Sequence, residues 1–197
     1  MATTTNSILR AEPTPLFRRA KPQDAVDLAV ATFVGGDRVD LQALATQLAV
    51  SRATLHRWFG SREQLLDRVC EQLAVRFTSA AAAAAVGDGD ERVCVFCRRL
   101  METAVEYEPV RSFVAREPEL ALRLILGKDG AVHRVVSQAV RSVIAETRPP
   151  RRAKPLEGRI DVIVQVATAL VWATFVVGDA PQIDSAVEII RMILAAG

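Results

Sequence analysis

The chain has 197 residues, of which 50% are hydrophobic, 24% are charged and 5% are aromatic. This composition is typical of a globular protein and excludes wholesale disorder. The formal net charge of +2 is too small to indicate a nucleic-acid partner alone, so that function has to rest on local clusters of basic residues. Three cysteines in a chain with no recognisable secretory segment predict a cytoplasmic location.

The N-terminal third predicts a basic tail followed by a small helical domain over residues 21–66. Residues 1–20 carry several arginines, and we expect a mobile tail there. The first helix begins at Pro22, where a missing N–H costs nothing, and Gly35-Gly36 ends it. The second helix follows Asp40 as its N-cap and covers about residues 41–48.

A tight turn separates the second predicted helix from the third. Residues 49–51 form this turn, Ser51 is placed to cap the third helix, and that helix ends near Trp58-Phe59. Ser61 and Gln64 have the spacing of a capping box, which predicts a long fourth helix that runs into residues 80–85. At about 1.5 Å per residue, such a helix is long enough to connect this domain to the centre of a second one.

Residues 67–197 predict a larger helical domain whose helices are separated by glycine and proline. After the fourth helix, apolar residues recur at helical spacing in segments at about 90–105, 109–117, 118–126, 131–146, 156–177 and 182–195. Residues 148–155 are predicted to form an exposed linker. Because no segment carries a strand pattern above noise, the expected fold class is all-α.

The segment over residues 41–65 places two short helices in series with a tight turn between them. This arrangement braces the second helix for insertion into the major groove of double-stranded DNA. Leu55 and Phe59 are expected to anchor that helix inside. The outward residues with suitable chemistry for base edges or phosphates are Ser51, Arg52, Thr54, His56 and Arg57. The amides of Ser61 and Arg62, at a helix start, favour phosphate. A helical hairpin with exposed arginines and no DNA contact is the alternative.

The run over residues 44–65 reads L-A-T-Q-L-A-V-S-R-A-T-L-H-R-W-F-G-S-R-E-Q-L. With unbroken spacing, it resembles the TetR-family pattern I-A-x-x-A-G-V-S-x-x-x-I/L-Y-x-Y/H-F-x-S/T-K-E/D-x-L. The resemblance implies a dimeric transcriptional regulator, in most cases a repressor, with a DNA-binding head and a ligand-binding body. It places His56 at the phosphate-contacting tyrosine, Trp58 at the second aromatic and Arg62 at the lysine that clamps the DNA backbone. Ala49 replaces the usual turn glycine, at a cost of about 1 kcal/mol if its backbone is left-handed.

The body of such a regulator holds a small-molecule effector in an apolar cavity with a few polar groups. The apolar residues that we predict to line it are Phe96, Leu100, Tyr107, Phe113, Leu122, Trp172 and Phe175. The polar groups expected to face inward are Arg116, His133, Asp161 and Gln165. Each apolar residue has ordinary core packing as its alternative, and each polar one has a surface or dimer contact. Residues 116–124 and 130–136 also resemble the QsdR-like branch of the family, which implies an acyl or lactone effector.

The last two predicted helices suggest a homodimer interface rather than a membrane span. Residues 160–177 are apolar over about the length of a span, but Asp161 would be costly inside a lone span, so we expect a helix buried between proteins. A dimer predicts two heads in successive major grooves and a palindromic operator. The apolar faces expected to pair across the dimer are Ile160, Ile163, Val164, Ala167 and Val171, and then Ile183, Val187, Ile190 and Leu194.

The pair Cys94 and Cys97 has C-x-x-C spacing, which leaves a thiol-based redox regulator as the alternative function. Only Cys70 and His133 remain as potential partners for a metal site, so structural thiols are the favoured interpretation and no metal or cofactor is expected. The two histidines lie in different predicted domains and no glycine-rich phosphate loop is present. The sequence therefore does not predict an enzyme.

Overall fold

The computed structural model describes residues 20–148 and 154–196, and all regular structure in these residues is helical. The predicted all-α class is therefore confirmed. The predicted tail, apart from Ala20, lies outside the described residues, as do residues 149–153 of the predicted linker.

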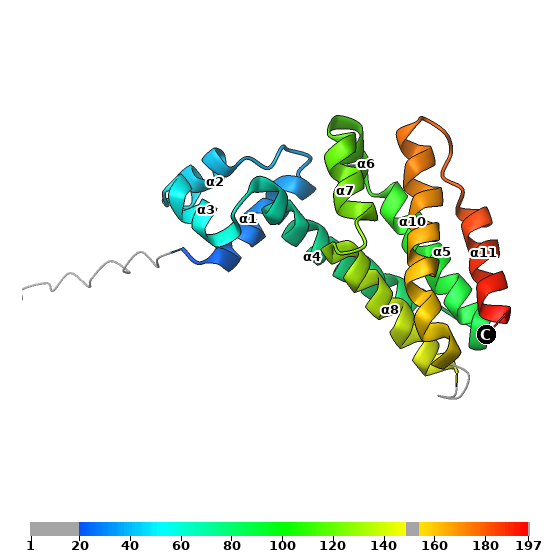
Figure 1. The fold of residues 1–197 in the computed structure, drawn as a ribbon. Helices are drawn as coiled ribbons and strands as arrows, with labels where there is room; N and C mark the ends of the chain where they lie inside the picture. Colours follow the sequence, from blue (N-terminus) through cyan, green and yellow to red (C-terminus); the bar gives the residue numbers. More distant parts are fainter. Residues whose placement is uncertain (1–19, 149–153, 197) are drawn as a thin grey trace, which may run out of the picture.

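Three short helices form a head at one end of the molecule (Figure 1). They are α1 (Pro22–Val34), α2 (Leu41–Gln47) and α3 (Arg52–Phe59). Asp40 caps α2, because its side chain accepts hydrogen bonds from the backbone N–H groups of Gln42 and Ala43, both at 2.9 Å. Ser51 caps α3 by accepting from the backbone N–H of Thr54 at 3.0 Å. These side chains satisfy amides that have no partner within the helix, so the helix starts are fixed by the sequence.

The turn between α2 and α3 bends at Ala49. Its φ of 52° is left-handed, and among the described residues no other non-glycine residue has a positive φ. The turn delivers the backbone N–H of Val50 to the carbonyl oxygen of Ala45 at 3.0 Å. An alanine held in this conformation costs roughly 1–2 kcal/mol relative to the right-handed region, which the rest of the head must offset.

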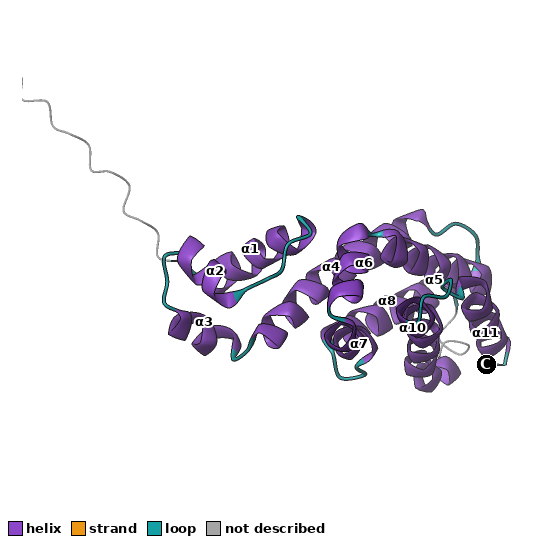
Figure 2. Ribbon diagram, turned by 90° about the horizontal axis from the view of Figure 1, so that it is seen from above, coloured by secondary structure: helices purple, strands orange, loops and turns teal. Residues whose placement is uncertain are grey.

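Helix α4 (Arg62–Ala84) leads from the head into the body (Figures 1 and 2). Ser61 caps it by accepting from the backbone N–H of Gln64 at 3.1 Å. Within the head α4 packs against α1, and within the body it packs against α5 and α8. The predicted division at residue 66 thus falls inside one continuous helix, which belongs to both the head and the body.

The body consists of helices packed around α4 and α5. They are α5 (Gly89–Glu106), α6 (Glu108–Arg116), α7 (Pro118–Leu126), α8 (Ala131–Thr147), the short 3-10 helix η1 (Lys154–Arg159), α10 (Ile160–Val176) and α11 (Ile183–Ala195). Buried leucine, isoleucine, valine and phenylalanine side chains form a hydrophobic cluster that continues from the head through the body.

Two details of the C-terminal part differ from the predictions. The predicted linker begins at Arg148, yet the side chain of Arg148 is only 10% exposed, pairs with Asp90 and donates to the carbonyl oxygen of Leu194 at 2.9 Å. This arginine therefore ties the end of α8 to α5 and α11. The predicted helix at 156–177 begins as the 3-10 turn η1 and becomes α-helical at Ile160.

The faces predicted to pair across a dimer are wrong at the level of residues. Eight of the nine named side chains are buried within the chain itself, and Ile183 is half-buried. Helix α10 is apolar on both sides, so sequence spacing alone selected the side that faces the core of its own body. The outer side carries Val162, which is 51% exposed, and the outer side of α11 carries Met192, which is 59% exposed.

Candidate functional site

Helix α3 presents basic side chains to solvent. Leu55 is completely buried and fixes the helix to the head, whereas Arg52, His56 and Arg57 are exposed on its outer side. The structure thus places these three side chains outward, as the sequence predicted. Arginine presents a planar fork of donors that matches a guanine edge or a phosphate, so this surface suits duplex DNA.

Ser51 and Thr54 lie at the N-terminal end of the same helix and bond to each other. Their hydroxyl oxygens are 2.9 Å apart, in addition to the bond from the Thr54 N–H to Ser51 Oγ. Ser51 is exposed and Thr54 is half-buried. The hydroxyls are therefore held in place before any contact with DNA, which reduces the entropy that such a contact has to overcome.

Trp58 lies to the side of this surface. Its ring packs edge-on against Phe59, with centroids 6.3 Å apart, and it lines a polar groove of about 440 Å³ together with Gln64, Arg68 and Arg134. The predicted role at the DNA backbone came from the resemblance. The observed contacts place the ring toward the junction of α3, α4 and α8.

Arg62 is engaged within the protein, in contrast to the predicted grip on the DNA backbone. Its Nη1 and Nη2 donate to the two carboxylate oxygens of Glu117, both at 2.7 Å, and its Nε donates to the carbonyl oxygen of Val39 at 2.5 Å. The side chains of Arg62 and Glu117 are each only 21% exposed. In this conformation Arg62 joins the head to the turn between α6 and α7.

Two further arginines strengthen the same junction. Arg38 lies 3.5 Å from a Glu117 oxygen, and Arg116 Nη1 donates to the carbonyl oxygen of Gly36 at 2.6 Å. The hydrogen bonds from Arg62 lower the pKa of the Glu117 carboxyl, so it is held ionised. We call this set, Arg62, Glu117, Arg38, Arg116 and the Gly36 carbonyl, the head–body clasp.

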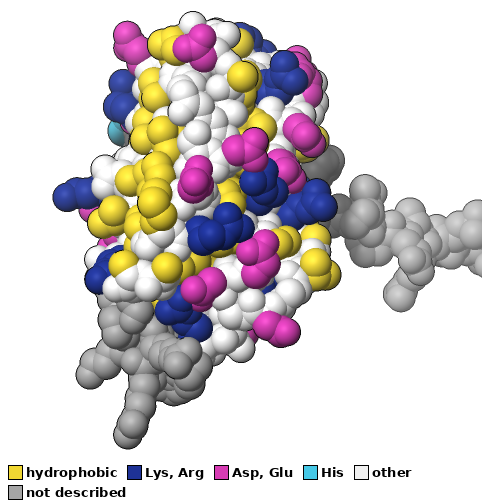
Figure 3. Space-filling model, turned by 90° about the vertical axis from the view of Figure 1, so that its right-hand side faces the viewer, with side chains coloured by type: hydrophobic (Ala, Val, Ile, Leu, Met, Phe, Trp, Pro, Cys, Tyr) yellow, Lys and Arg dark blue, Asp and Glu magenta, His cyan; other side chains and the backbone are white. Residues whose placement is uncertain are grey.

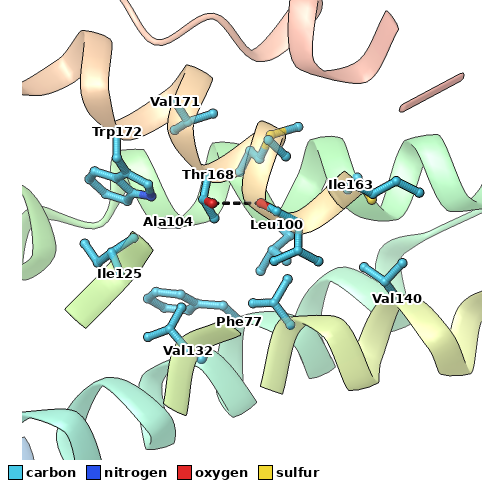
Figure 4. Close-up of a pocket in the computed structure, with 16 residues that line it drawn as sticks. Phe77, Leu100, Ala104, Ile125, Val132, Val140, Ile163, Thr168, Val171 and Trp172 are labelled. Atoms are coloured by element: carbon cyan, nitrogen blue, oxygen red, sulfur yellow. Dashed lines mark hydrogen bonds between the residues drawn. The ribbon is translucent and has the colours of Figure 1, made fainter. Parts of the chain in front are cut away.

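The body contains an apolar cavity between α4, α5, α7, α8 and α10 (Figure 4). Its volume is about 90 Å³. Figure 4 shows Phe77 and Val132 on one side and Trp172, Val171 and Thr168 on the other. The remaining lining residues are Ala74, Cys97, Leu100, Met101, Ala104, Ile125, Val136, Val140, Ile163, Val164 and Ala167.

A second apolar cavity, of about 70 Å³, lies next to the first on the side of the head. Its wall includes Phe33 of α1 and Phe113 of α6, whose rings pack edge-on with centroids 5.4 Å apart. Neither cavity has a charged residue among its described lining residues. The arrangement is suited to an apolar ligand and offers no counter-charge to an ionised one.

The residues predicted to line an effector site are divided by the structure. Leu100 and Trp172 line the first cavity, and Phe113 and Trp172 line the second. The other four apolar candidates, Phe96, Tyr107, Leu122 and Phe175, do not line either cavity. Phe96 is core, Tyr107 packs edge-on against Phe77 at 5.2 Å, and Phe175 packs against Trp172 at 5.8 Å.

The predicted polar groups do not converge on the cavities either. Arg116 belongs to the clasp, and Gln165 is exposed on α10. Asp161, whose side chain is 69% exposed, accepts from Ser137 at 3.2 Å and lies 3.4 Å from His133 Nε2. Most of the wall comes instead from alanine, valine and isoleucine at helical spacing, which sequence analysis cannot distinguish from ordinary core.

Comparison with known proteins identifies the body. Residues 88–195 match the family model described as "Tetracyclin repressor-like, C-terminal domain". This match covers more than half of the chain. The chain belongs to the TetR family of transcriptional regulators. A search of curated protein sequences gives no significant match.

Solved TetR-family structures share the whole fold. The transcriptional repressor QsdR of R. erythropolis is 23% identical, with a TM-score of 0.80 over 88% of this chain and 94% of that one. The repressor AlkX of Dietzia sp. strain DQ12-45-1b, implicated in biodegradation of n-alkanes, is 18% identical, with a TM-score of 0.62 over 90% of this chain and 96% of that one. At these identities the likeness establishes the fold of this TetR-family chain.

The three cysteines of this TetR-family chain are buried. Burial raises the pKa of Cys70 and of Cys97 to about 12, and burial also raises the pKa of Cys94. All three are free thiols. Because the thiolate is the reactive form, a raised pKa lowers the reactivity of these thiols at neutral pH. Within residues 20–148 and 154–196, no three histidine, cysteine or acidic side chains are grouped to hold a metal.

Proposed function

We propose that this TetR-family regulator is a homodimeric repressor that binds a palindromic DNA operator and is released by a small apolar effector. The observation that carries the proposal is the outward presentation of Arg52, His56 and Arg57 on a helix braced by the buried Leu55. An exposed basic surface on a short, well-capped helix is suited to the major groove. Such an assignment places the protein in the cytoplasm, with DNA as its partner.

Homodimer formation through α10 and α11 is supported by an uncovered apolar surface. The segment Leu156–Val176 is long and apolar enough to cross a membrane, yet only 28% of its most apolar 18-residue window is buried inside the chain. Figure 3 views the end of the body where α10 and α11 lie, and hydrophobic side chains form a band across it. A second copy covers such a band in the usual symmetric way, whereas a lone span would place Asp161 in lipid.

The outer residues of α10 recur at the spacing of a helix–helix seam. Val162, Val166, Ala169 and Ala173 follow one another at intervals of three or four residues and are exposed or half-buried. Small side chains at such a seam allow close approach of a symmetry-related helix. We infer that this stripe, with Met192 of α11, is the centre of the dimer interface.

Effector control is supported by the position of the cavities. They border α4, which continues into the head, so a ligand that repositions α4 changes the separation of the two α3 helices in a dimer. Coupling of this kind is typically worth about 1–3 kcal/mol, or up to roughly a hundredfold in operator affinity. To change the separation of the α3 helices in this way, the ligand has to reposition only α4 and need not contact the head.

The proposal is tested by selecting bound duplexes from a random pool with the full chain and measuring their affinity by fluorescence anisotropy. We expect enrichment of a palindrome with half-sites about one helical turn apart, and weaker binding when an apolar effector is added. Recovery of no enriched sequence at moderate salt would contradict the DNA-binding part. Unchanged operator affinity at saturating effector would contradict only the release part.

A further inference from the structure

The two apolar cavities lie side by side and share part of their walls. Six residues line both, namely Ala74, Phe77, Ala104, Ile125, Val132 and Trp172. In Figure 4 the ring of Phe77 lies beside Val132, with Trp172 and Ile125 at the same end of the first cavity. Because these six residues border both cavities, a rotation of their side chains would join the two into one passage along α4.

The far end of this passage is formed by the DNA-binding head itself. Phe33 of α1 and Phe113 of α6 meet there edge to face, with ring centroids 5.4 Å apart. Three residues beyond each ring in the sequence, the carbonyl oxygen of Gly36, in the turn after α1, accepts a hydrogen bond of 2.6 Å from Arg116. The aromatic contact between α1 and α6 is thus followed by the bond between Arg116 and Gly36, which is one part of the head–body clasp.

Both cavities are small, and none of their lining residues within the described part of the chain is charged. Volumes of about 90 and 70 Å³ are well below the roughly 300–1,000 Å³ of a site for a bulky ligand. Thr168 is the hydroxyl in the wall, and its oxygen already donates to the carbonyl oxygen of Val164 at 2.7 Å. These properties exclude wide ring systems and ligands with an ionised group at the buried end.

We propose that the effector is an unbranched aliphatic chain that lies along α4 with its uncharged end against Phe33, and that a chain long enough to reach Phe33 separates the head from α6. The proposal rests on the effector-controlled function proposed above and adds the class of ligand and the point at which it acts. Phe33, a residue of the DNA-binding head, becomes the specificity-determining residue for effector chain length. Entry of the chain end between Phe33 and Phe113 lengthens the bond between Arg116 and Gly36 and loosens the contact of the head with α6.

The test uses straight-chain primary alcohols of increasing length as probes of the full-length protein. The chain has two tryptophans, so a Trp58→Phe background leaves Trp172, in the shared wall, as the fluorescent reporter of binding. Each methylene added within the passage should tighten binding about fourfold, and the gain should stop when the chain end meets Phe33. Operator release, measured by anisotropy in the protein with Trp58 intact, should begin only near that length.

Two variants locate the end of the passage. Phe33→Leu should move the optimum to longer alcohols, and Phe113→Leu, on the other side of the same end, should do so as well. Phe96→Leu is the matched control, because Phe96 is fully buried but lines neither cavity, and its optimum should stay at the original length. Dicarboxylates of equal length, which carry a charge at both ends, should bind at least tenfold more weakly.

The outcomes separate this inference from the function on which it rests. If alcohols bind and release the operator but the optimum is the same in wild type, Phe33→Leu and Phe113→Leu, the effector switch stands and the role of Phe33 is wrong. If short and long alcohols release the operator equally, the proposal that the end of the chain separates Phe33 from Phe113 is wrong. If no alcohol binds, the proposal that the effector is an unbranched aliphatic chain is wrong, even if the protein binds its operator tightly. If the dicarboxylates bind as tightly as the alcohols, the proposal that the buried end of the effector is uncharged is wrong.

Discussion

Replacing Glu117 with glutamine tests whether Arg62 serves the head–body clasp or the DNA backbone. The substitution keeps the shape of the side chain but removes the charge that receives two 2.7 Å hydrogen bonds from Arg62. Exposed ion pairs contribute about 0.2–1 kcal/mol and hydrogen bonds to charged groups about 1.5–3 kcal/mol. With both side chains 21% exposed, the pair lies between these limits, and we expect a loss of about 1–2 kcal/mol in the free energy of unfolding.

The loss is measured by urea unfolding and by thermal unfolding followed by circular dichroism. For a chain of this length it corresponds to a fall of about 2–8 °C in Tm. Glu119→Gln, which changes an exposed carboxyl in the first turn of α7, two residues after Glu117, is the matched control and should change Tm little. In a double-mutant cycle with Arg62→Gln, the two losses should overlap by about 1 kcal/mol or more; additive losses would refute the clasp.

The acid dependence of the same variant supplies an independent check. The bonds from Arg62 lower the pKa of Glu117 in the folded state, so the folded carboxyl binds its proton less readily than the unfolded one. Its contribution to stability is therefore complete above the unfolded pKa of glutamate, about 4.3, and is lost as the pH falls through the folded pKa. The stability difference between wild type and Glu117→Gln should be constant at neutral pH and should close in acid.

Three shorter predictions concern the turn, the dimer and the thiols. Ala49→Gly should raise the free energy of unfolding in urea by up to about 1 kcal/mol, because glycine tolerates the φ of 52°; a lower stability would contradict the assigned strain. Val162→Asp, on the exposed seam of α10, should convert the dimer to monomer in sedimentation experiments, whereas Val177→Asp, an exposed valine beyond the end of α10, should leave the dimer intact. Peroxide should leave operator affinity unchanged, since burial keeps Cys97 protonated; loss of affinity that Cys97→Ser prevents would restore the redox interpretation.

The head could be predicted from the sequence almost residue by residue because its boundaries are local. Asp40, Ser51 and Ser61 each cap a helix through an amide two or three residues away, and the left-handed Ala49 sits where the turn requires it. Both partners of each of these interactions lie within a short stretch of sequence, so the sequence alone can predict them. The exposure of Arg52 and Arg57 then follows from the position of Leu55 on the same helix.

The partner of Arg62 could not be predicted from the local sequence. Its partner Glu117 is 55 residues away in the sequence, in the turn between α6 and α7, so no spacing rule connects them. Most of the cavity wall could not be predicted for a related reason. The sequence points to large side chains, and Leu100, Phe113 and Trp172 do line the cavities, but alanine and valine form much of the wall, and only packing reveals where small side chains leave space. Helix α10 is apolar on two sides, so periodicity could not select the side that faces its own core.

The proposed function depends on contacts between DNA bases and the exposed arginines of α3. These contacts are tested by the anisotropy of a labelled operator, obtained by selection, with wild type and with Arg57→Ala, compared with a scrambled duplex at several salt concentrations. A base contact is worth about 1–3 kcal/mol, so we expect a loss of about 5- to 150-fold on the operator and a much smaller loss on the scrambled duplex. Equal affinity of wild type and Arg57→Ala for the operator would contradict it.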